Sequence, residues 1–366
     1  MTFDDVLTIK NGKNQKSVEN PHGAYPIYGS GGVMGRADDY ICKADTVIIG
    51  RKGNINKPIY VDEPFWNVDT AFGLEADTSV LLPRYLYYFC QKYDFEKINK
   101  AVTIPSLTKA DLLKIEIRLP EIDAQQSIVD VLFGLERIID KRRQEINKFD
   151  ELIKARFVEM FGSVYDNEFE KKTIPEFVLN DKNAIKRGPF GGALKKEDFV
   201  ESGYLVYEQR HAIHEDFEYE KYYISPEKYQ EMIGFKVLPK DLIISCSGVT
   251  LGRIAEIPEG AKEGIINQAL LKLSLDQSKM MNKFFIQQFR GEEIQDILFG
   301  FSRGSGIPNM PSMNEVKAVK FICPPIELQN QFCRFVEQID KSKSAIQKSL
   351  DETQLLFDKL MQLYFG

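Results

Sequence analysis

Residues 120–162 read PEIDAQQSIVDVLFGLERIIDKRRQEINKFDELIKARFVEMFG, and residues 324–366 read PPIELQNQFCRFVEQIDKSKSAIQKSLDETQLLFDKLMQLYFG. The two segments align without a gap at an offset of 204 residues. The identities at this offset include Gln125/Gln329, Phe161/Phe365 and Gly162/Gly366. A repeat with so long a period predicts two large half-molecules rather than a solenoid of short repeats.

Both copies have the apolar periodicity of a long helix. When nine positions are taken alternately three and four residues apart along each copy, seven of the nine residues are apolar. This spacing is typical of a coiled-coil seam. We assign these residues to the seam: Leu132, Leu135, Ile139, Ile146, Phe149, Ile153, Ile339, Ile346, Leu350 and Phe357. Polar residues, which can fix the register of a coiled coil, interrupt it at Arg142, Arg156, Lys343 and Thr353.

The first helix is predicted to run from about residue 124 to residue 161. Asp123 and Gln126 have the spacing of a capping box at its start, and Gly162 and Gly366 are suited to end the two helices. About 38 residues give a length of about 57 Å, more than the width of a ~100-residue domain. We therefore favour helices that pair with each other; the alternative is two amphipathic helices packed on separate cores.

The remaining segments, 1–119 and 163–323, are large enough to be domains, here called the first and second heads. Each has a strand, a glycine turn, a strand, a helix, an Ile-Pro loop and a closing strand. The expected elements are strands 45–50, 56–61 and 114–118 with helix 85–97, then strands 241–245, 252–257 and 318–322 with helix 282–299. The predicted fold is α+β, with two mixed α/β heads joined by antiparallel coiled-coil helices, 120–162 and 324–366, in two pseudo-twofold halves.

Composition excludes several classes of protein. Hydrophobic residues at 43% and charged residues at 28% exclude a disordered or fibrous chain. The net charge of -6 argues against a protein that coats DNA nonspecifically, for which a pI above about 9 is expected. The first head has no net charge and the second has -3. In the second head several lysines precede an acidic run, so a separate basic face is compatible with the total.

The five cysteines lie far apart and form no C-x-x-C pair, as in reduced cytosolic proteins. The N-terminus lacks the features of a signal peptide, and no apolar run approaches the roughly 18 residues that span a bilayer. We therefore expect a cytoplasmic protein with no membrane partner.

Motifs for catalysis or metal binding are missing from the sequence. Residues 29–34 begin like G-x-G-x-x-G but end in Met34, and no phosphate-binding P-loop occurs. His211 and His214 have no carboxylate or cysteine at the spacing of metal ligands. The N-P-P-[YF] string of amino-methyltransferases is also missing. We expect a non-catalytic chain that binds no metal or cofactor.

Several glycine-containing loops carry groups that bind DNA. Arg and Lys pair with guanine and phosphate, and Asn and Gln pair with adenine. The candidate DNA contacts are Tyr28, Ser30, Gly31, Arg51, Lys52, Asn54, Thr103 and Ser106 in the first head, and Lys186, Arg187, Phe190, Lys195, Arg210, Ser247, Arg303 and Ser305 in the second. Glycine turns beside a lysine are common on protein surfaces, so any one loop alone can be an ordinary turn.

The whole chain resembles the specificity (S) subunit of type I restriction-modification systems, the HsdS family. The resemblance rests on L-P-x-I-x-x-Q-Q from Leu119, on R-F-x-E-M-F-G ending at Gly162, and on a second head and helix in the same order. Residues 188–194 and 241–253 of the second head, together with the Ile-Pro loops, add further matches. One departure is Cys246, where many such heads have a basic residue.

The resemblance implies that each head reads one half of a bipartite double-stranded DNA target. The helices would set the spacing, about 34 Å for half-sites one turn apart, and dock two methyltransferase (M) subunits. Two restriction (R) subunits join them in systems that cleave DNA. S-adenosylmethionine and ATP with Mg²⁺ would serve these partner subunits, and the lone chain would bind DNA weakly. The alternatives are a coiled-coil scaffold with protein-binding heads and, disfavoured by the missing motifs, a fused restriction enzyme.

Overall fold

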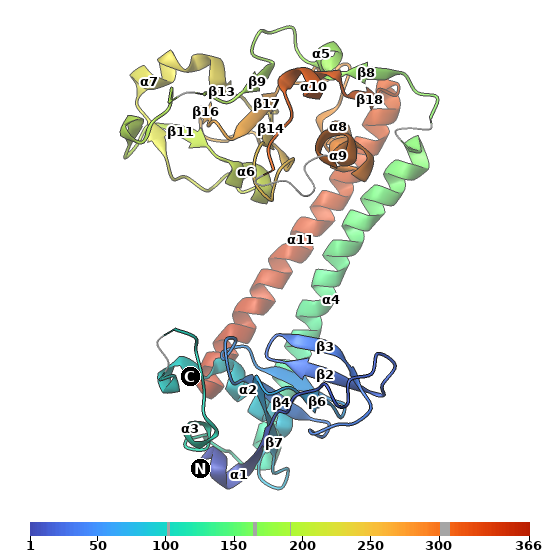
Figure 1. Cartoon of the computed structure of the whole chain (residues 1–366). Coiled ribbons are helices and arrows are strands. Elements are labelled where there is room, and N and C mark those ends of the chain that lie inside the picture. The colour runs from blue at the N-terminus through green and yellow to red at the C-terminus, as the bar shows by residue number, and fades with distance from the viewer. Residues whose placement is uncertain (101–102, 164–166, 191, 301–307) are drawn as a thin grey trace. The chain divides into compact units, whose positions relative to one another are not determined.

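The computed structural model describes residues 1–100, 103–163, 167–190, 192–300 and 308–366. The chain forms two compact units: the first contains residues 1–146 and 345–366, and the second contains residues 147–344. Each unit combines one head with part of two 40-residue helices, α4 (Ile122–Phe161) and α11 (Ile326–Phe365) (Figure 1). The predicted class, two mixed heads and two long helices, is confirmed.

The first head contains two small sheets that enclose apolar cores. The strands are β1 (Leu7–Asn11), β2 (Tyr25–Gly29), β3 (Gly32–Ala37), β4 (Thr46–Gly50), β5 (Ile59–Val61), β6 (Trp66–Asn67) and β7 (Ala71–Ala76). One sheet has the order β1-β7-β4-β5 and is antiparallel throughout, and the other has the order β3-β2-β6. The helices are α1 (Phe3–Val6), α2 (Pro83–Lys92), η1 (Phe95–Ile98) and α3 (Lys109–Leu112).

The second head has more elements in the same general plan. Its strands are β8 (Lys171–Thr173), β9 (Ile185–Arg187), β10 (Phe199–Val200), β11 (Tyr204–Tyr207), β12 (Tyr223–Ile224), β13 (Lys236–Val237), β14 (Leu242–Ser245), β15 (Ile254–Glu256), β16 (Gly264–Ile266), β17 (Leu270–Leu273) and β18 (Lys320–Ile322). Its helices are α5 (Ile174–Phe177), η2 (Lys196–Asp198), α6 (Gln209–His214), α7 (Pro226–Glu231), η3 (Ile233–Phe235), α8 (Asn282–Arg290), α9 (Glu292–Phe299) and α10 (Met313–Ala318).

The sheets show that the heads are duplicates. The order β9-β17-β14-β15 in the second head repeats β1-β7-β4-β5 in the first, with every pair antiparallel. In each head one strand of the second sheet also has a parallel neighbour, β6 beside β2 and β16 beside β11. An equivalent backbone hydrogen bond lies next to each parallel pair. Val68 N–H donates to Tyr28 O in the first head, and Asn267 N–H donates to Tyr207 O in the second, each at 2.9 Å. The repeated order of elements predicted from the sequence therefore reflects a repeated topology.

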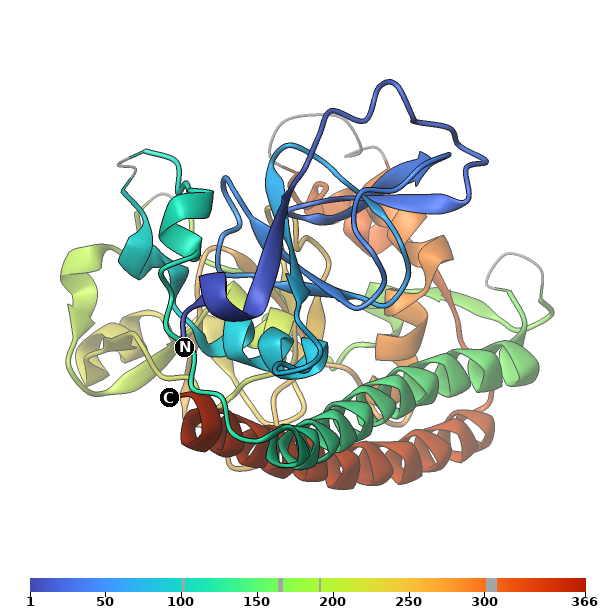
Figure 2. The ribbon, with the colours of Figure 1, turned by 90° about the horizontal axis from the view of Figure 1, so that it is seen from below.

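Within each unit the two long helices run antiparallel and side by side (Figures 1 and 2). In the first unit Arg142 Nη1 donates to Ser349 O at 2.6 Å and also to the Thr353 hydroxyl. In the second unit Lys343 Nζ lies 2.7 Å from Asp150 Oδ1. Three of the four polar residues predicted to interrupt the seam thus bond across it, and every predicted apolar seam residue is buried or half-buried.

The predicted start of the first helix is wrong in detail. α4 begins at Ile122, so Asp123 lies inside the first turn, where its carboxylate faces the positive end of the helix, rather than before the helix as a cap. The side chain of Gln126 donates instead to Asp130 Oδ1 at 2.7 Å. The predicted end is confirmed, because Gly162 has a φ of +67° and its N–H bonds to Val158 O.

Three other predicted elements differ from the structure. The helix 85–97 is divided, because α2 ends at Lys92 and residues 95–98 form the separate 3-10 helix η1. In place of the predicted closing strand 114–118, the structure has only an isolated bridge between Glu116 and Thr2, because no extended strand pairs with this segment among the described residues. The helix 282–299 is broken into α8 and α9, since Gly291 adopts an extended conformation between them. The closing strand of the second head is confirmed as β18.

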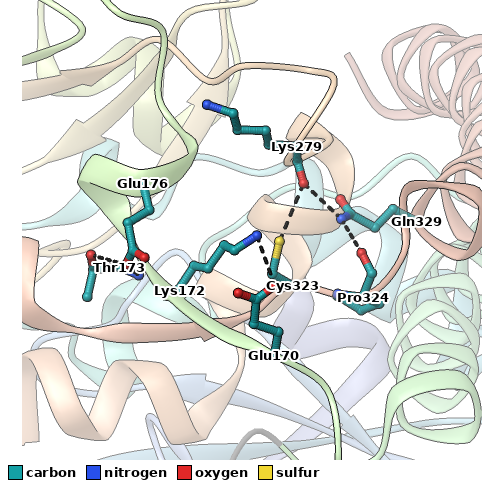
Figure 3. A network of polar contacts seen from close by, with 8 residues as sticks. All are labelled: Glu170, Lys172, Thr173, Glu176, Lys279, Cys323, Pro324 and Gln329. Atoms are coloured by element: carbon teal, nitrogen blue, oxygen red, sulfur yellow. Dashed lines mark hydrogen bonds and ion pairs between the residues drawn. The ribbon is translucent and has the colours of Figure 1, made fainter.

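A buried glutamine fixes each long helix to its own head. Gln125 Oε1 accepts the N–H of Leu82, the residue before α2, at 2.9 Å, and its Nε2 donates to the carbonyls of Val80 and Pro120. Gln329 makes the same three bonds in the second unit. Its Oε1 accepts the Met281 N–H, and its Nε2 donates to the carbonyls of Lys279 and Pro324, the two bonds drawn in Figure 3. The identity Gln125/Gln329 therefore marks a duplicated joint between helix and head.

Replacing Gln125 with leucine should lower the free energy of unfolding of the first unit by about 3 kcal/mol. The change leaves one buried N–H and two carbonyls without partners, at about 1–3 kcal/mol for each lost partner, partly relieved by relaxation. The chain has one tryptophan, Trp66, buried in the first head, so urea unfolding followed by its fluorescence reports on this unit. The control is Gln126→Leu at the exposed neighbouring position; an equal effect of the two changes would contradict the joint.

No helix in the described part of the chain is long and apolar enough to cross a membrane. All five cysteines are unpaired, and four of them are buried. Among the described residues, no group of three or more His, Cys, Asp or Glu side chains is placed to hold a metal ion.

Candidate nucleic-acid interface

In the first head, the loop that follows β4 lies against the Ile-Pro loop. Leu107 N–H donates to Arg51 O at 2.9 Å, and Gly53 N–H donates to Pro105 O at 3.0 Å. Between these bonds Lys52 pairs with Ser106 as an isolated bridge. Gly53 has a φ of +77°, which favours glycine at this turn. The backbone therefore brings two sequence-predicted loops, about 50 residues apart, to one edge of the head.

The turn between β2 and β3 reaches the same edge. A Cβ placed on Gly50 would lie 3.1 Å from the Ser30 Cβ, and one placed on Gly31 would lie 4.0 Å from the Asn54 Nδ2. Six of the eight predicted contacts in this head thus gather here: Ser30, Gly31, Arg51, Lys52, Asn54 and Ser106. We call this set the first loop edge.

The charged and amide side chains of the first loop edge are exposed, and the Arg51 guanidinium also lies 5.8 Å from the Phe72 ring centroid. Arg51, Lys52 and Asn54 are exposed, and none of the described residues forms an ion pair with either cation. Tyr28 differs, since its ring packs against Phe65 with centroids 5.4 Å apart and its burial raises the pKa of the phenol. The Tyr28 side chain therefore supports the first loop edge by packing beneath it. Thr103 is exposed beside the Ile-Pro loop, and no described contact joins it to the edge.

The second head repeats this construction bond for bond. Met310 N–H donates to Cys246 O and Gly248 N–H to Pro308 O, both at 2.8 Å. Ser247 forms the isolated bridge with Asn309, and Gly248 has a φ of +80°. These bonds make Cys246, Ser247, Gly248 and Val249 the counterparts of Arg51, Lys52, Gly53 and Asn54. We call this region, with the neighbouring turn described next, the second loop edge.

A second turn, residues 188–190, lies beside the loop after β14. The two are neighbours because they bond to adjacent residues, Leu270 and Ala269. Gly188 N–H donates to Leu270 O and Cys246 N–H to Ala269 O. The turn carries Phe190, which is 69% exposed, and Arg187, whose guanidinium lies 5.7 Å from the Phe190 ring centroid. Burial lowers the pKa of Arg187, and its Nη1 has no partner among the described residues. An arginine held this way has unused hydrogen-bonding capacity.

The chemistry of the two loop edges has diverged. The two cations of the first edge are replaced by Cys246, which is fully buried, and by the small Ser247. The thiol of Cys246 is buried beneath the surface, so this departure from the family pattern leaves no side chain there that can contact a phosphate. Val249 takes the place of Asn54 and is 98% exposed. The first edge therefore carries two exposed cations and an amide, and the second presents a hydroxyl, an aromatic ring, a bare aliphatic side chain and the half-buried Arg187 guanidinium.

The other predicted contacts of the second head lie elsewhere or are engaged. Lys186 Nζ lies 4.6 Å from the Phe235 ring centroid, and Arg210 pairs with Asp216 at 3.7 Å. Lys195 stands before η2, where its N–H donates to Asp198. Arg303 and Ser305 lie outside the described residues.

Sequence reasoning missed residues that the duplication reveals. Gly12 corresponds to Gly188, since both donate to the first residues of the equivalent strands β7 and β17, and a Cβ on either would lie 1.8 Å from a carbonyl oxygen. Lys13 and Asn14, both exposed, therefore occupy the positions of Pro189 and Phe190. A comparison of the two glycine turns in the sequence could have found them.

Val249 and Gln209 were also missed. The Gln209 Oε1 accepts the N–H groups of Cys246 and Ser247, at 3.2 and 3.1 Å, and so holds the second loop edge to α6. No sequence motif marked this glutamine. Val249 carries no polar group, so a search for hydrogen-bonding side chains passes over it.

Two heads of one topology, each with an exposed loop edge of hydrogen-bonding and apolar groups and each joined to paired helices, define a duplicated nucleic-acid recognition protein. Comparison with known families gives the particular family. The chain belongs to the family described as the type I restriction modification DNA specificity domain, whose model matches residues 1–148 and 189–353.

Individual relatives agree with this family. A putative type I restriction enzyme specificity subunit of Haemophilus influenzae is 23% identical over 362 residues, which cover 95% of this chain and 89% of the relative. A putative type I specificity subunit of Mycoplasma pneumoniae is 27% identical over 160 residues, 42% of this chain and 52% of the relative. The crystal structure of a type I restriction-modification S subunit from M. genitalium shares the fold, with a TM-score of 0.66, 18% identity and coverage of 100% of this chain and 95% of that one.

The family assigns this chain to DNA sequence recognition and not to catalysis, as predicted from the sequence. The alternative of a scaffold with protein-binding heads is not favoured, because DNA-specificity matches cover both heads. The fused restriction enzyme is likewise not favoured.

Proposed function

We propose that each loop edge reads one half of a split double-stranded DNA target. The observation that carries the proposal is the repeated hydrogen-bonding frame, which holds diverged side chains at equivalent positions of the two heads. A rigid frame with variable, exposed side chains suits recognition, because base edges are read by few side chains in fixed positions. Arg51 and Lys52 have the charge to contact phosphate or guanine.

The two half-sites should differ in sequence. The Asn54 amide suits an adenine edge, whereas the aliphatic Val249 at the equivalent position suits the methyl group of thymine. The buried Cys246 leaves the second loop edge without the cations of the first. Arg187 and the exposed Phe190 then provide the second head's nearest charged and aromatic groups.

The long helices are proposed to set the separation of the half-sites and to dock two methyltransferase subunits. Two restriction subunits would join in systems that also cleave DNA. S-adenosylmethionine, and ATP with Mg²⁺, would be used by these partners, and the assembly would work in the cytoplasm. The solved structure of a type I system with a TM-score of 0.55 to this chain concerns the assembly of such a complex, which supports the proposal of subunit partners.

The lone chain is proposed to bind DNA weakly. Its net charge is -6, and the first head, which carries the cationic loop edge, has no net charge. Nonspecific affinity for DNA comes from neutralising phosphates, so most of the cationic surface would come from the partner subunits.

Replacing Arg51 and Lys52 together with alanine should reduce the salt dependence of DNA binding. Each lost phosphate contact lowers the slope of log K against log salt by about 0.9, so two lost contacts lower it by about 1.8. The measurement is titration of target DNA with the complex of this chain and its cognate methyltransferase subunit at several salt concentrations.

The control is Lys92→Ala, an exposed lysine at the end of α2 and outside the loop edge. It should leave the slope unchanged. A double variant whose slope and affinity equal those of the native complex would contradict the placement of DNA on the first loop edge.

A further inference from the structure

One aliphatic side chain of the second loop edge points away from the core of its head. Val249 is 98% exposed, the highest exposed fraction of any large hydrophobic residue in the described part of the chain. It follows Gly248, whose φ of +80° and open surroundings mark the tip of the loop after β14. A valine so placed contributes almost nothing to packing, so both of its methyl groups are available to a ligand.

Hydrogen bonds hold the loop on which Val249 stands. Gly248 N–H donates to Pro308 O at 2.8 Å. The Gln209 Oε1 accepts the N–H of Ser247 at 3.1 Å. The β-branched side chain of valine is itself restricted at χ1. The loop therefore presents its methyl groups in a defined position, and their contact with a ligand costs little conformational entropy.

A second apolar side chain lies on the neighbouring turn, residues 188–190. Phe190 is 69% exposed, with the Arg187 guanidinium 5.7 Å from its ring centroid. A single exposed apolar residue needs no explanation, but two on adjacent turns of one edge indicate an apolar ligand group. The first head carries two exposed amides, Asn14 and Asn54, at the corresponding positions. The apolar character therefore belongs to the second loop edge and not to the duplicated frame.

The methyl group of thymine is the apolar group that base edges offer in the major groove. Thymine and cytosine differ there in two ways: thymine has the methyl group, and it has an acceptor oxygen where cytosine has an amino donor. The polar side chain closest in sequence to Val249 on this edge is Ser247, whose hydroxyl can donate or accept and so suits either base. The buried Cys246 presents no group at all. The methyl group is then the feature by which these side chains separate thymine from cytosine.

We propose that Val249 reads one pyrimidine of the second half-site by its 5-methyl group, so that thymine and 5-methylcytosine are both preferred to their unmethylated forms. The exposed Phe190 extends the apolar surface beside it. This inference rests on the proposed function, which places DNA on the loop edge, and adds the chemical group that is read. DNA methylated at carbon 5 of cytosine then offers the second head targets that unmethylated DNA lacks.

The test uses the complex of the full chain with its cognate methyltransferase subunit and synthetic duplexes of its methylated target. Each thymine in turn is replaced by deoxyuridine, which lacks the methyl group and keeps the base pair. At one position the replacement should weaken binding about fourfold, the effect of one methyl group leaving an apolar contact. At that position a 5-methylcytosine·guanine pair should also bind about fourfold more tightly than a cytosine·guanine pair.

Two variants of the reading residue accompany these duplexes. Val249→Ala should remove both methyl effects, and the conservative change Val249→Ile should keep them. Neither change disturbs folding, because the side chain is exposed. The matched control is Asn54→Ala at the equivalent position of the first loop edge, which should weaken binding but keep both methyl effects.

The outcomes separate the inference from the function on which it rests. Specific binding of the native complex with no methyl effect at any thymine, or a methyl effect that survives Val249→Ala, would overturn the inference alone. A native complex that binds its target no more tightly than a scrambled duplex would overturn the proposed function, and the inference with it.

Discussion

Insertion of seven residues after Ile146 and seven after Ser344 is expected to abolish methylation at the native spacing and to move any remaining methylation to a target with a longer spacer. The two insertion points lie at the boundaries between the units, so each long helix is lengthened where it passes from one unit to the other. Seven residues add about 10.5 Å of helix, which corresponds to about three base pairs at 3.4 Å each. One heptad shifts the phase of the seam by only about 20°, so the helices can still pair.

Methylome sequencing of cells that express the variant with its methyltransferase subunit measures the spacer. Total methylation should fall, because three base pairs rotate the duplex by about a hundred degrees relative to the second half-site. The control replaces the seven residues before each insertion point with the inserted sequence and leaves the helix length unchanged. An unchanged spacer in the insertion variant would contradict the role of the helices as the spacing element.

The long helices were predictable because their signal is both periodic and repeated. Two aligned copies, each with an apolar side chain every three or four residues, fix the helices to within two residues of their observed ends. The start at Ile122 was missed because Asp123 has the same preference for the first turn as for the cap. The Gln125/Gln329 identity was visible, but its meaning depends on carbonyls more than 40 residues away in sequence.

The loop edges were only partly predictable. Glycine, lysine and arginine marked the loop after β4 and the turn that carries Arg187, whereas Val249 and Gln209 carry no recognisable signal. Their positions depend on hydrogen bonds between the loop after β14 and segments about 40 to 60 residues away, which composition and spacing do not encode. The equivalence of Arg51 with Cys246 likewise becomes certain only when the bonds to Leu107 and Met310 are compared.

Exchange of the second head, residues 163–323, for that of a relative with a different target is expected to rewrite one half of the recognised sequence. The joint at Gln329 tolerates foreign sequence, because its head partners are the backbone atoms of Lys279 and Met281. The donor head should keep an aromatic residue at position 284, since Phe284 packs against Phe157 with centroids 5.5 Å apart. Each mismatched base pair costs about 1–3 kcal/mol, so the native second half-site should no longer be methylated.

The matched control exchanges the second head for one from a relative with the same target, which should leave the motif unchanged. The most direct measurement is the methylome of cells that express the chimaera with the native methyltransferase subunit, compared with that of the native chain. The account predicts a split motif in both, with the same first half and the same spacer and a different second half in the chimaera. A motif without a spacer in the native chain, or a change in both halves of the chimaera's motif, would contradict independent reading by the two heads.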